Sequence, residues 1–197
     1  MSLWVGIGIL ALLLSSACAG DGYHAVDAAN SGLSSLTVAD DYRHQRRLQQ
    51  TLLEDTRFAG LRLTAYVIMD HGYIVGHVQS PEQAEAVFQV AKKVEGLRSV
   101  NAFLPLKRTV DGIGKVTSDA ALKEHVQAAL AQAPGVVDAR VQVEVLDGRA
   151  VLLGVVSDVD EKSRAEGAAA ATAGVKRVIS WLLLSETEYL AIRSQVF

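Results

Sequence analysis

The feature that most constrains this chain is an internal repeat with a spacing of 78 residues. Residues 118–185 align with residues 40–107 without a gap, and the apolar positions of the two segments stay in phase. The aligned positions include two pairs of glycines, Gly76 with Gly154 and Gly96 with Gly174. Repeated segments of this kind fold as repeated structural units. The sequence therefore predicts two similar units in tandem.

The predicted boundaries follow from the repeat and from the composition around it. We assign the first unit to residues 40–109, a linker to 110–116, the second unit to 117–185, and a C-terminal helix or disordered tail to 186–197.

Each unit has the pattern of helix, strand, strand, helix and strand. In the second unit, apolar residues recur every four positions after the N-cap candidates Ser118 and Asp119, which is typical of a helix. Residues 139–146 then alternate apolar and polar, which predicts a strand with one buried face and one face in solvent. The dipeptide Asp147-Gly148 is typical of a tight turn into a returning strand.

The first unit shows the clearest second helix, with Ser80 as N-cap, Pro81 as first residue and Gln83 at the capping-box position. Two helices can cover one face of a three-stranded sheet. We therefore predict the α+β class, in which each α-β-β-α-β unit is a three-stranded mixed sheet backed by two helices.

Glycines inside or beside predicted strands need a physical reason, because glycine weakens a strand. We interpret Gly76 and Gly154 as positions where a helix crosses close to the sheet. Gly96 and Gly174 follow the second helix of each unit, where a left-handed helix cap is common.

The N-terminus predicts export. Residues 3–17 form a run of 15 apolar and small residues, which is shorter than the ~20 that a membrane-spanning helix needs and suits a secretory signal. The run ends in Ser-Ala directly before Cys18, the one cysteine of the chain. This pattern resembles a bacterial lipobox, which implies a signal peptide over residues 1–17 and acylation of Cys18. The alternative is a plain signal peptide with an unmodified cysteine. Residues 18–39, rich in Gly, Ala, Ser and Asp, predict a flexible tether.

The repeated pattern resembles the BON domain family of bacteria. The resemblance rests on Asp147-Gly148, the strand that ends in Gly154, the helix after it and "GVKRV" before the last strand, with a weaker copy in the first unit. With the lipobox, it implies a dual-BON-domain outer-membrane lipoprotein. Such a protein would be held at the periplasmic face through Cys18, and Ala19 favours sorting to the outer membrane. The family implies non-enzymatic work, namely binding to phospholipid membranes and support of envelope integrity. The alternative is a periplasmic protein-interaction adaptor without intrinsic lipid binding.

Composition argues against several other classes. The net charge of -3 at pH 7 disfavours a nucleic-acid-binding protein. The five histidines have no metal-ligand spacing with one another or with the cysteine, and no nucleophile or phosphate-loop motif occurs. We therefore predict no catalytic residues, no metal site and no cofactor, and we do not expect an enzyme.

Two sets of residues are candidates for contact with an anionic phospholipid membrane or with envelope proteins. The basic candidates are Arg43, Arg46 and Arg47 on one face of the first helix, with Lys92 and Lys93 further along the first unit. The alternative for the basic residues of the first helix is a solvent-exposed helix face without a binding role. The apolar candidate is Trp181, on a face of the last strand that the helices cannot also cover. We expect that face to meet the other unit, the C-terminal segment, or a partner or membrane surface.

Acylation of Cys18 can be tested directly. Mass spectrometry of the mature N-terminus is expected to find an acylated Cys18 as the first residue, because the lipobox directs cleavage and lipid attachment there. The Cys18→Ser variant is expected to lose the acyl mass and also its retention in the membrane pellet, since several acyl chains are needed for stable anchoring. An unmodified cysteine in the parent chain would contradict the lipobox.

Overall fold

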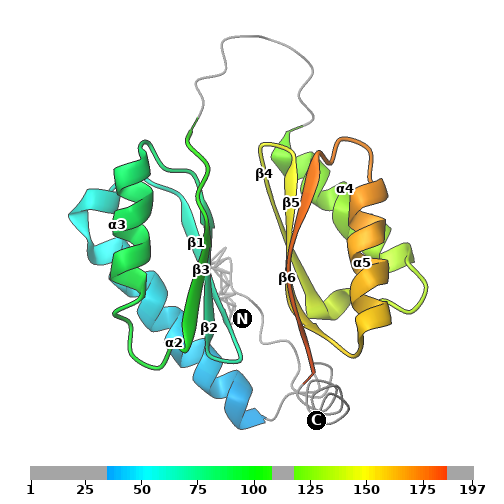
Figure 1. Ribbon diagram of the computed structural model, residues 1–197, viewed down its shortest axis with the longest axis horizontal. Helices are drawn as coiled ribbons and strands as arrows, with labels where there is room; N and C mark the ends of the chain where they lie inside the picture. Colours follow the sequence, from blue (N-terminus) through cyan, green and yellow to red (C-terminus); the bar gives the residue numbers. More distant parts are fainter. Residues whose placement is uncertain (1–34, 108–117, 186–197) are drawn as a thin grey trace, which may run out of the picture.

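The computed structural model describes residues 35–107 and 118–185, which form two units of the same architecture (Figure 1). Unit 1 consists of α2 (Ser35–Glu54), the 3-10 helix η1 (Thr56–Phe58), β1 (Leu63–Ile68), β2 (His71–Gly76), α3 (Pro81–Ala91) and β3 (Ser99–Phe103). Unit 2 consists of α4 (Asp119–Gln132), the 3-10 helix η2 (Asp138–Arg140), β4 (Val141–Leu146), β5 (Arg149–Val156), α5 (Val159–Ala171) and β6 (Arg177–Leu184). The predicted order of helices and strands is confirmed in both units.

Each sheet is mixed, as predicted. In unit 1 the strand order is β1-β2-β3, with β1 and β2 antiparallel and β2 and β3 parallel. Unit 2 repeats this arrangement as β4-β5-β6. The parallel pair requires a crossover, and the second helix of each unit supplies it.

Both helices of a unit cover the same face of its sheet and enclose a small apolar core there (Figure 1). In unit 2 the predicted stripe of Leu122, Val126 and Leu130 is at most 2% exposed. In unit 1, Leu48 and Leu52 of α2 have the same role. The α2 helix also satisfies the outer edge of β1, since the Gln45 and Gln49 side-chain oxygens accept hydrogen bonds from backbone N–H groups of that strand.

The first helix starts earlier than the sequence predicted. We assigned residues 18–39 to a flexible tether, but α2 begins at Ser35. Residues 35–39 contain neither glycine nor proline, so nothing in them stops the helix from extending toward the N-terminus. Composition alone did not separate this short segment from the tether.

The first two strands of each unit are joined by a two-residue turn with positive φ at both positions. The predicted turn at Asp147 and Gly148 is confirmed, with φ of 55° and 75°. In unit 1 the same place holds Met69 and Asp70, with φ of 52° and 62°. Such a turn matches the twist of the strands that it joins and normally selects glycine, asparagine or aspartate. Unit 1 adopts it with methionine at the first position and without glycine.

A buried carboxylate explains how this turn is held. Asp41 accepts hydrogen bonds from the backbone N–H groups of Met69 and Asp70, at 2.7 and 2.9 Å. Asp119 accepts the equivalent pair from Asp147 and Gly148, at 2.8 and 2.9 Å. We refer to this arrangement as the turn clasp. Asp119 was an N-cap candidate, but the hydroxyl of Ser118 is the oxygen that caps α4.

Burial raises the pKa of the Asp41 carboxyl above its usual range, and the N–H groups of Asp70 and Met69 counter part of that rise. Asp41 is only 7% exposed. The clasp therefore ties the first helix of unit 1 to its hairpin through a desolvated group.

The close approach at Gly76 and Gly154 does not come from an α-helix that crosses the sheet, so that interpretation is wrong. A Cβ at Gly154 would overlap the carbonyl oxygen of Arg140, and one at Gly76 would overlap that of Arg62. In each unit the glycine pairs with the first residue of the neighbouring strand, and the chain enters that strand directly over it. Gly154 also has a φ of 148°, which residues with a side chain rarely adopt.

Gly96 and Gly174 have the left-handed backbone that was predicted, with φ of 91° and 98°. They do not cap the helices directly, because α3 ends at Ala91 and α5 at Ala171. They lie in the turns that follow, where a Cβ at Gly96 would overlap the His44 ring of α2. These glycines therefore let the turns close against the first helix of the unit.

Replacing Gly154 by alanine is expected to destabilise the chain by about 1–3 kcal/mol, because the new Cβ meets backbone that cannot rotate away. The matched control is Gly167→Ala in α5, where nothing lies within 4 Å of the added Cβ and helix propensity favours alanine by about 0.5–1 kcal/mol. Thermal and urea unfolding of the two variants measure the difference. Equal stability of the two variants would show that the overlap is relieved without cost.

Candidate functional site

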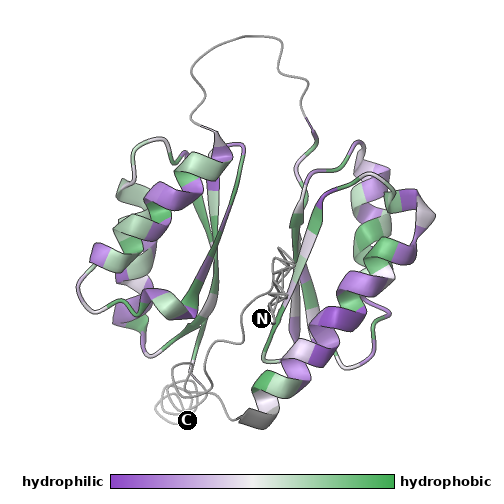
Figure 2. Cartoon of the chain, turned by 180° about the vertical axis from the view of Figure 1, so that it is seen from behind, coloured by the Kyte–Doolittle hydropathy of each residue, from purple (hydrophilic) through white to green (hydrophobic). Residues whose placement is uncertain are grey.

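The first candidate surface is the face of each sheet that no helix covers. In the structure these two faces pack against each other, with the helices outside (Figure 1). The inter-unit cluster consists of seven buried residues: Tyr66, Ile68, Tyr73 and Val75 of unit 1, and Val151, Leu153 and Val155 of unit 2. Each is at most 5% exposed. Apolar residues accordingly fill the strands between the two helical layers (Figure 2).

Trp181 belongs to this junction. Its ring packs on that of Tyr73, with centroids 5.2 Å apart and planes inclined by 31°. Of the three occupants that the sequence left open for this face, the structure shows the other unit. Trp181 is therefore half-buried between the sheets and does not lie beside the basic candidates.

The prediction of a solvent-facing side for residues 139–146 is wrong. The alternate residues Gln142, Glu144 and Leu146 are half-buried, and Glu144 accepts hydrogen bonds from the Tyr66 hydroxyl of unit 1 and from Lys123 of α4. The neighbouring strand β5 carried the missing signal, because its sequence "RAVLLGVV" is apolar on both faces, which indicates a strand covered on both sides.

Polar contacts surround the inter-unit cluster. The Nε2 atom of His77 lies 3.2 Å from the Asp147 carboxylate of the other unit, and the Arg149 guanidinium lies 5.6 Å from the centre of the Phe103 ring. Together with the contact of Tyr66 and Glu144, they fix how the two units are placed. No local sequence pattern indicates these pairs, because each joins two residues that are far apart in the sequence and meet only in the folded chain.

The second candidate surface is the outward side of α2. Arg43 and Arg47 are 74% and 58% exposed, and Arg46 is exposed as well. They lie opposite Leu48, which is fully buried. Figure 2 shows α2 as a largely hydrophilic helix on the outside of unit 1.

The structure brings the second basic segment next to this helix. Glu95, in the turn after α3, lies 3.8 Å from Arg47, and Gly96 of the same turn lies against His44. Lys92 and Lys93 precede this turn and are exposed. We use "basic face" for six residues: Arg43, Arg46, Arg47, Lys92, Lys93 and Arg98.

Carboxylates partly balance the basic face. Arg43 pairs with Asp40, Arg47 with Glu95, and Arg98 with Asp70, which also lies 3.3 Å from the His44 ring. Arg46, Lys92 and Lys93 have no carboxylate partner among the described residues. Six exposed cations therefore stand beside the three carboxylates that pair with them and the buried carboxylate of Asp41, so the face carries net positive charge although the chain is acidic overall.

The remaining sequence predictions fall partly outside the described residues. Cys18, the linker 110–116 and the segment 186–197 all lie there. Within residues 35–107 and 118–185, no helix combines the length and apolar character needed to cross a membrane. The same residues contain no group of three or more His, Cys, Asp or Glu side chains arranged to hold a metal ion.

Comparison with known proteins supports the duplication. The sequence model of the BON domain family matches residues 40–107 and again residues 118–184. The osmotically-inducible protein Y of Escherichia coli (strain K12) is 38% identical over 104 residues, which make up 52% of this chain and 52% of that protein. The chain thus spans about half the length of this curated relative.

Two solved structures of CdsD, a structural protein of the type III secretion system of Chlamydia trachomatis, are also similar to this chain. They are 16% and 18% identical to it, with TM-scores of 0.31 and 0.29. The matched regions make up 78% and 73% of this chain, and 68% and 66% of the two CdsD chains. Similarity at this level supports no functional inference.

The inter-unit packing depends on Tyr73 remaining neutral. An unfolded tyrosine ionises near pH 10.0, whereas burial, with a contribution from the Asp41 charge, raises the pKa of Tyr73 to about 12. The folded chain keeps the Tyr73 proton to a higher pH than the unfolded chain does. The stabilisation that the buried neutral hydroxyl contributes is therefore fully present below pH 10 and is lost as the pH rises toward 12. Over this range the free energy of unfolding is expected to fall more steeply in the parent chain than in the Tyr73→Phe variant.

Urea unfolding of a chain that begins at Ala19 measures this difference, because Trp181 is then the only tryptophan and reports on the junction by its fluorescence. The control is Tyr42→Phe, since Tyr42 is 49% exposed. If the parent chain and Tyr73→Phe lost stability equally with pH, Tyr73 would not be buried between the units.

Proposed function

Since the chain belongs to the BON domain family, we propose that it is a lipid-anchored protein of the bacterial cell envelope that binds anionic phospholipid and supports the integrity of the outer membrane. It acts by binding and performs no catalysis. The observation that carries this proposal is the basic face of unit 1, in which α2 and the segment after α3 contribute six exposed cations and meet where Arg47 lies 3.8 Å from Glu95.

The ion pairs on the basic face are weak enough to leave its cations available for binding to lipid phosphates. Exposed pairs of this kind contribute only about 0–1 kcal/mol each, because water screens them. A guanidinium group can therefore exchange its carboxylate for a lipid phosphate, which it binds in a bidentate manner. Near an anionic membrane each Lys or Arg contributes about 1 kcal/mol of attraction.

The position of the basic face in the chain suits an anchored protein. Arg43 follows the proposed acylation site Cys18 by 25 residues, and α2 is the first described element. A tether of this length keeps α2 close to the membrane surface that holds the acyl chains. The anchor thereby raises the effective concentration of lipid at the basic face, so weak individual contacts suffice.

The similarity to an osmotically-inducible protein supports a role in the envelope under osmotic stress. The closed inter-unit cluster is consistent with a binding mode that uses the outside of unit 1, because the apolar faces of both sheets are already occupied by each other.

Vesicle co-sedimentation tests the lipid claim, with a chain that begins at Ala19 so that the acyl anchor does not contribute. Vesicles containing phosphatidylglycerol are expected to bind it and purely zwitterionic vesicles are not. Combined replacement of Arg43, Arg46 and Arg47 by serine is expected to weaken binding by about 3 kcal/mol, or roughly a hundredfold. Added salt should weaken binding further, because exposed charges are screened.

The matched control replaces Arg164, Lys176 and Arg177, three exposed cations of unit 2, by serine. This change removes the same charge and should leave vesicle binding within a few-fold of the parent chain. If both triple variants bind equally, the basic face is not the contact. If the parent chain binds no anionic vesicle, the protein is better described as a periplasmic protein-interaction adaptor.

A further inference from the structure

We propose that unit 1 contains a second binding site, a pocket for a phosphate group. The pocket lies where the chain enters β1 and leaves β2, at the opposite end of the sheet from the turn of Met69 and Asp70. Its volume is about 340 Å³. It is lined by Gly60, Leu61, Arg62, His77, Val78, Gln79 and Lys107. The basic face adjoins the Met69–Asp70 turn, so the two sites are separate.

The charged or ionisable side chains of the lining are all basic, namely Arg62, His77 and Lys107, and no Asp or Glu is part of it. Arg62 and Lys107 are exposed, and neither side chain has a hydrogen-bond or ion-pair partner among the described residues. His77 is held by Asp147 of unit 2, at 3.2 Å, and its ring is charged only when protonated. Arg62 and Lys107 therefore supply the permanent positive charge, and the contact of Asp147 with His77 brings a carboxylate beside the lining.

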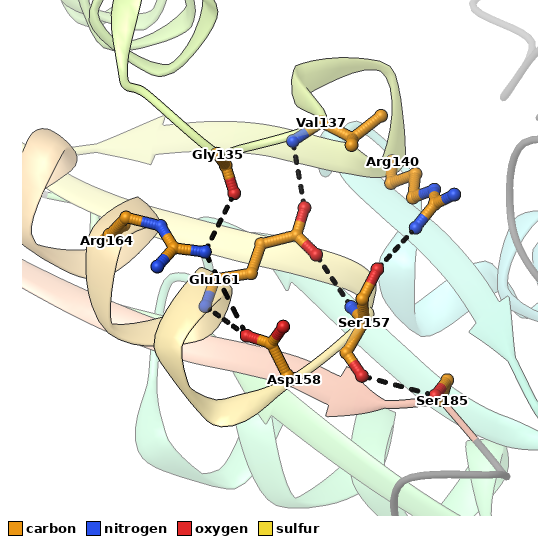
Figure 3. Close-up of polar contacts among 8 residues, drawn as sticks. All are labelled: Gly135, Val137, Arg140, Ser157, Asp158, Glu161, Arg164 and Ser185. Carbon is orange, nitrogen blue, oxygen red and sulfur yellow. Dashed lines mark hydrogen bonds and ion pairs between the residues drawn. The ribbon is translucent and has the colours of Figure 1, made fainter.

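The equivalent region of unit 2, around Arg140, Ser157 and Ser185, can be compared with this pocket. Figure 3 shows that region, in which Arg140 donates to the Ser157 hydroxyl at 2.8 Å and the Ser185 hydroxyl donates to the Ser157 carbonyl at 3.3 Å. Nearby, the Glu161 carboxylate accepts hydrogen bonds from Val137 and Ser157. Unit 2 thus pairs most polar groups of this region internally, although the buried Nε atom of Arg140 has no partner among the described residues.

The 78-residue offset identifies what differs in unit 1. Arg62 corresponds to Arg140, but His77 stands where unit 2 has Val155, and Lys107 where it has Ser185. Unit 1 therefore has basic residues at two positions that are neutral in unit 2, and it has Gln79 in place of Ser157, whose hydroxyl binds Arg140. The arginine is shared by both units, whereas the convergence of cations around an open pocket is particular to unit 1.

A phosphate group matches the hydrogen-bond donors of this lining. Its oxygens can accept a bidentate pair of hydrogen bonds from Arg62, a charge-assisted bond from Lys107 and a bond from the side-chain amide of Gln79. Gly60 at the pocket wall has a φ of 80°, and no atom lies within 4 Å of the position that a Cβ would occupy. This leaves room for a ligand next to the backbone. The phosphate can belong to a lipid headgroup or to a small soluble molecule.

Backbone amide NMR on a chain that begins at Ala19, which keeps both units whole, tests the site. Titration with inorganic phosphate is expected to shift the resonances of Gly60, Leu61 and His77, whereas chloride at equal ionic strength is not. Lys107→Ser, which copies the residue of unit 2, is expected to weaken binding about tenfold or more, because a hydrogen bond to a charged group is lost. Lys107→Arg should keep the affinity within a few-fold.

Further variants separate this site from other sources of charge. Arg177→Ser removes an exposed cation of unit 2 and should change nothing, and replacement of Arg43, Arg46 and Arg47 should leave phosphate binding intact even where vesicle binding is lost. Shifts caused only by vesicles of phosphatidylglycerol, and dependent on Lys107, would assign the pocket to a lipid headgroup. Shifts that are absent with both probes, equal with chloride, or unchanged in Lys107→Ser would overturn the proposal.

Discussion

The packing of the two sheets on each other is the constraint on which the rest of the structure depends. Two helices can cover only one face of a three-stranded sheet, and the other face of each unit is apolar, with Tyr73 and Leu153 near its centre. A single unit would expose this face to water, which soluble domains avoid on such a scale. The duplication solves the problem because each copy covers the other. All the charged surfaces then have to lie on the helical layers or at the ends of the sheets.

The junction has an approximate two-fold symmetry that follows from the repeat. Tyr66 and Glu144 occupy equivalent positions in the two units, and they touch each other. Two copies of one surface meet in this way only when a two-fold axis runs between them. The 78-residue offset relates His77 to Val155 and Asp147 to Met69. His77 and Asp147 form a polar contact between the units, whereas Val155 and Met69 pack in the apolar inter-unit cluster. The two equivalent places in the junction therefore differ in polarity.

The local features of the fold could be predicted from the sequence, and the long-range ones could not. Ser80 and Ser118 cap helices as expected, and Asp147-Gly148 forms the expected turn, because each is decided by neighbours in the chain. The reason for Gly154 was missed because the Arg140 carbonyl reaches it only after the strands pair. The basic residues of α2 could be predicted from their spacing, but the contact of Arg47 with Glu95 depends on how the turn after α3 folds back against that helix. The convergence of Arg62, His77 and Lys107 likewise joins three segments that no local pattern connects.

The turn clasp does not contribute equally to the two units. Asp147 and Gly148 favour their turn intrinsically, so the Asp119 carboxylate adds to a local preference that already exists. Met69 has no such preference, and its turn relies on the Asp41 carboxylate, which lies 28 residues away from Met69 along the chain. A contact between residues so far apart closes a loop, and this closure costs conformational entropy. Two copies with the same final architecture therefore maintain the same turn with different shares of local preference and long-range contact.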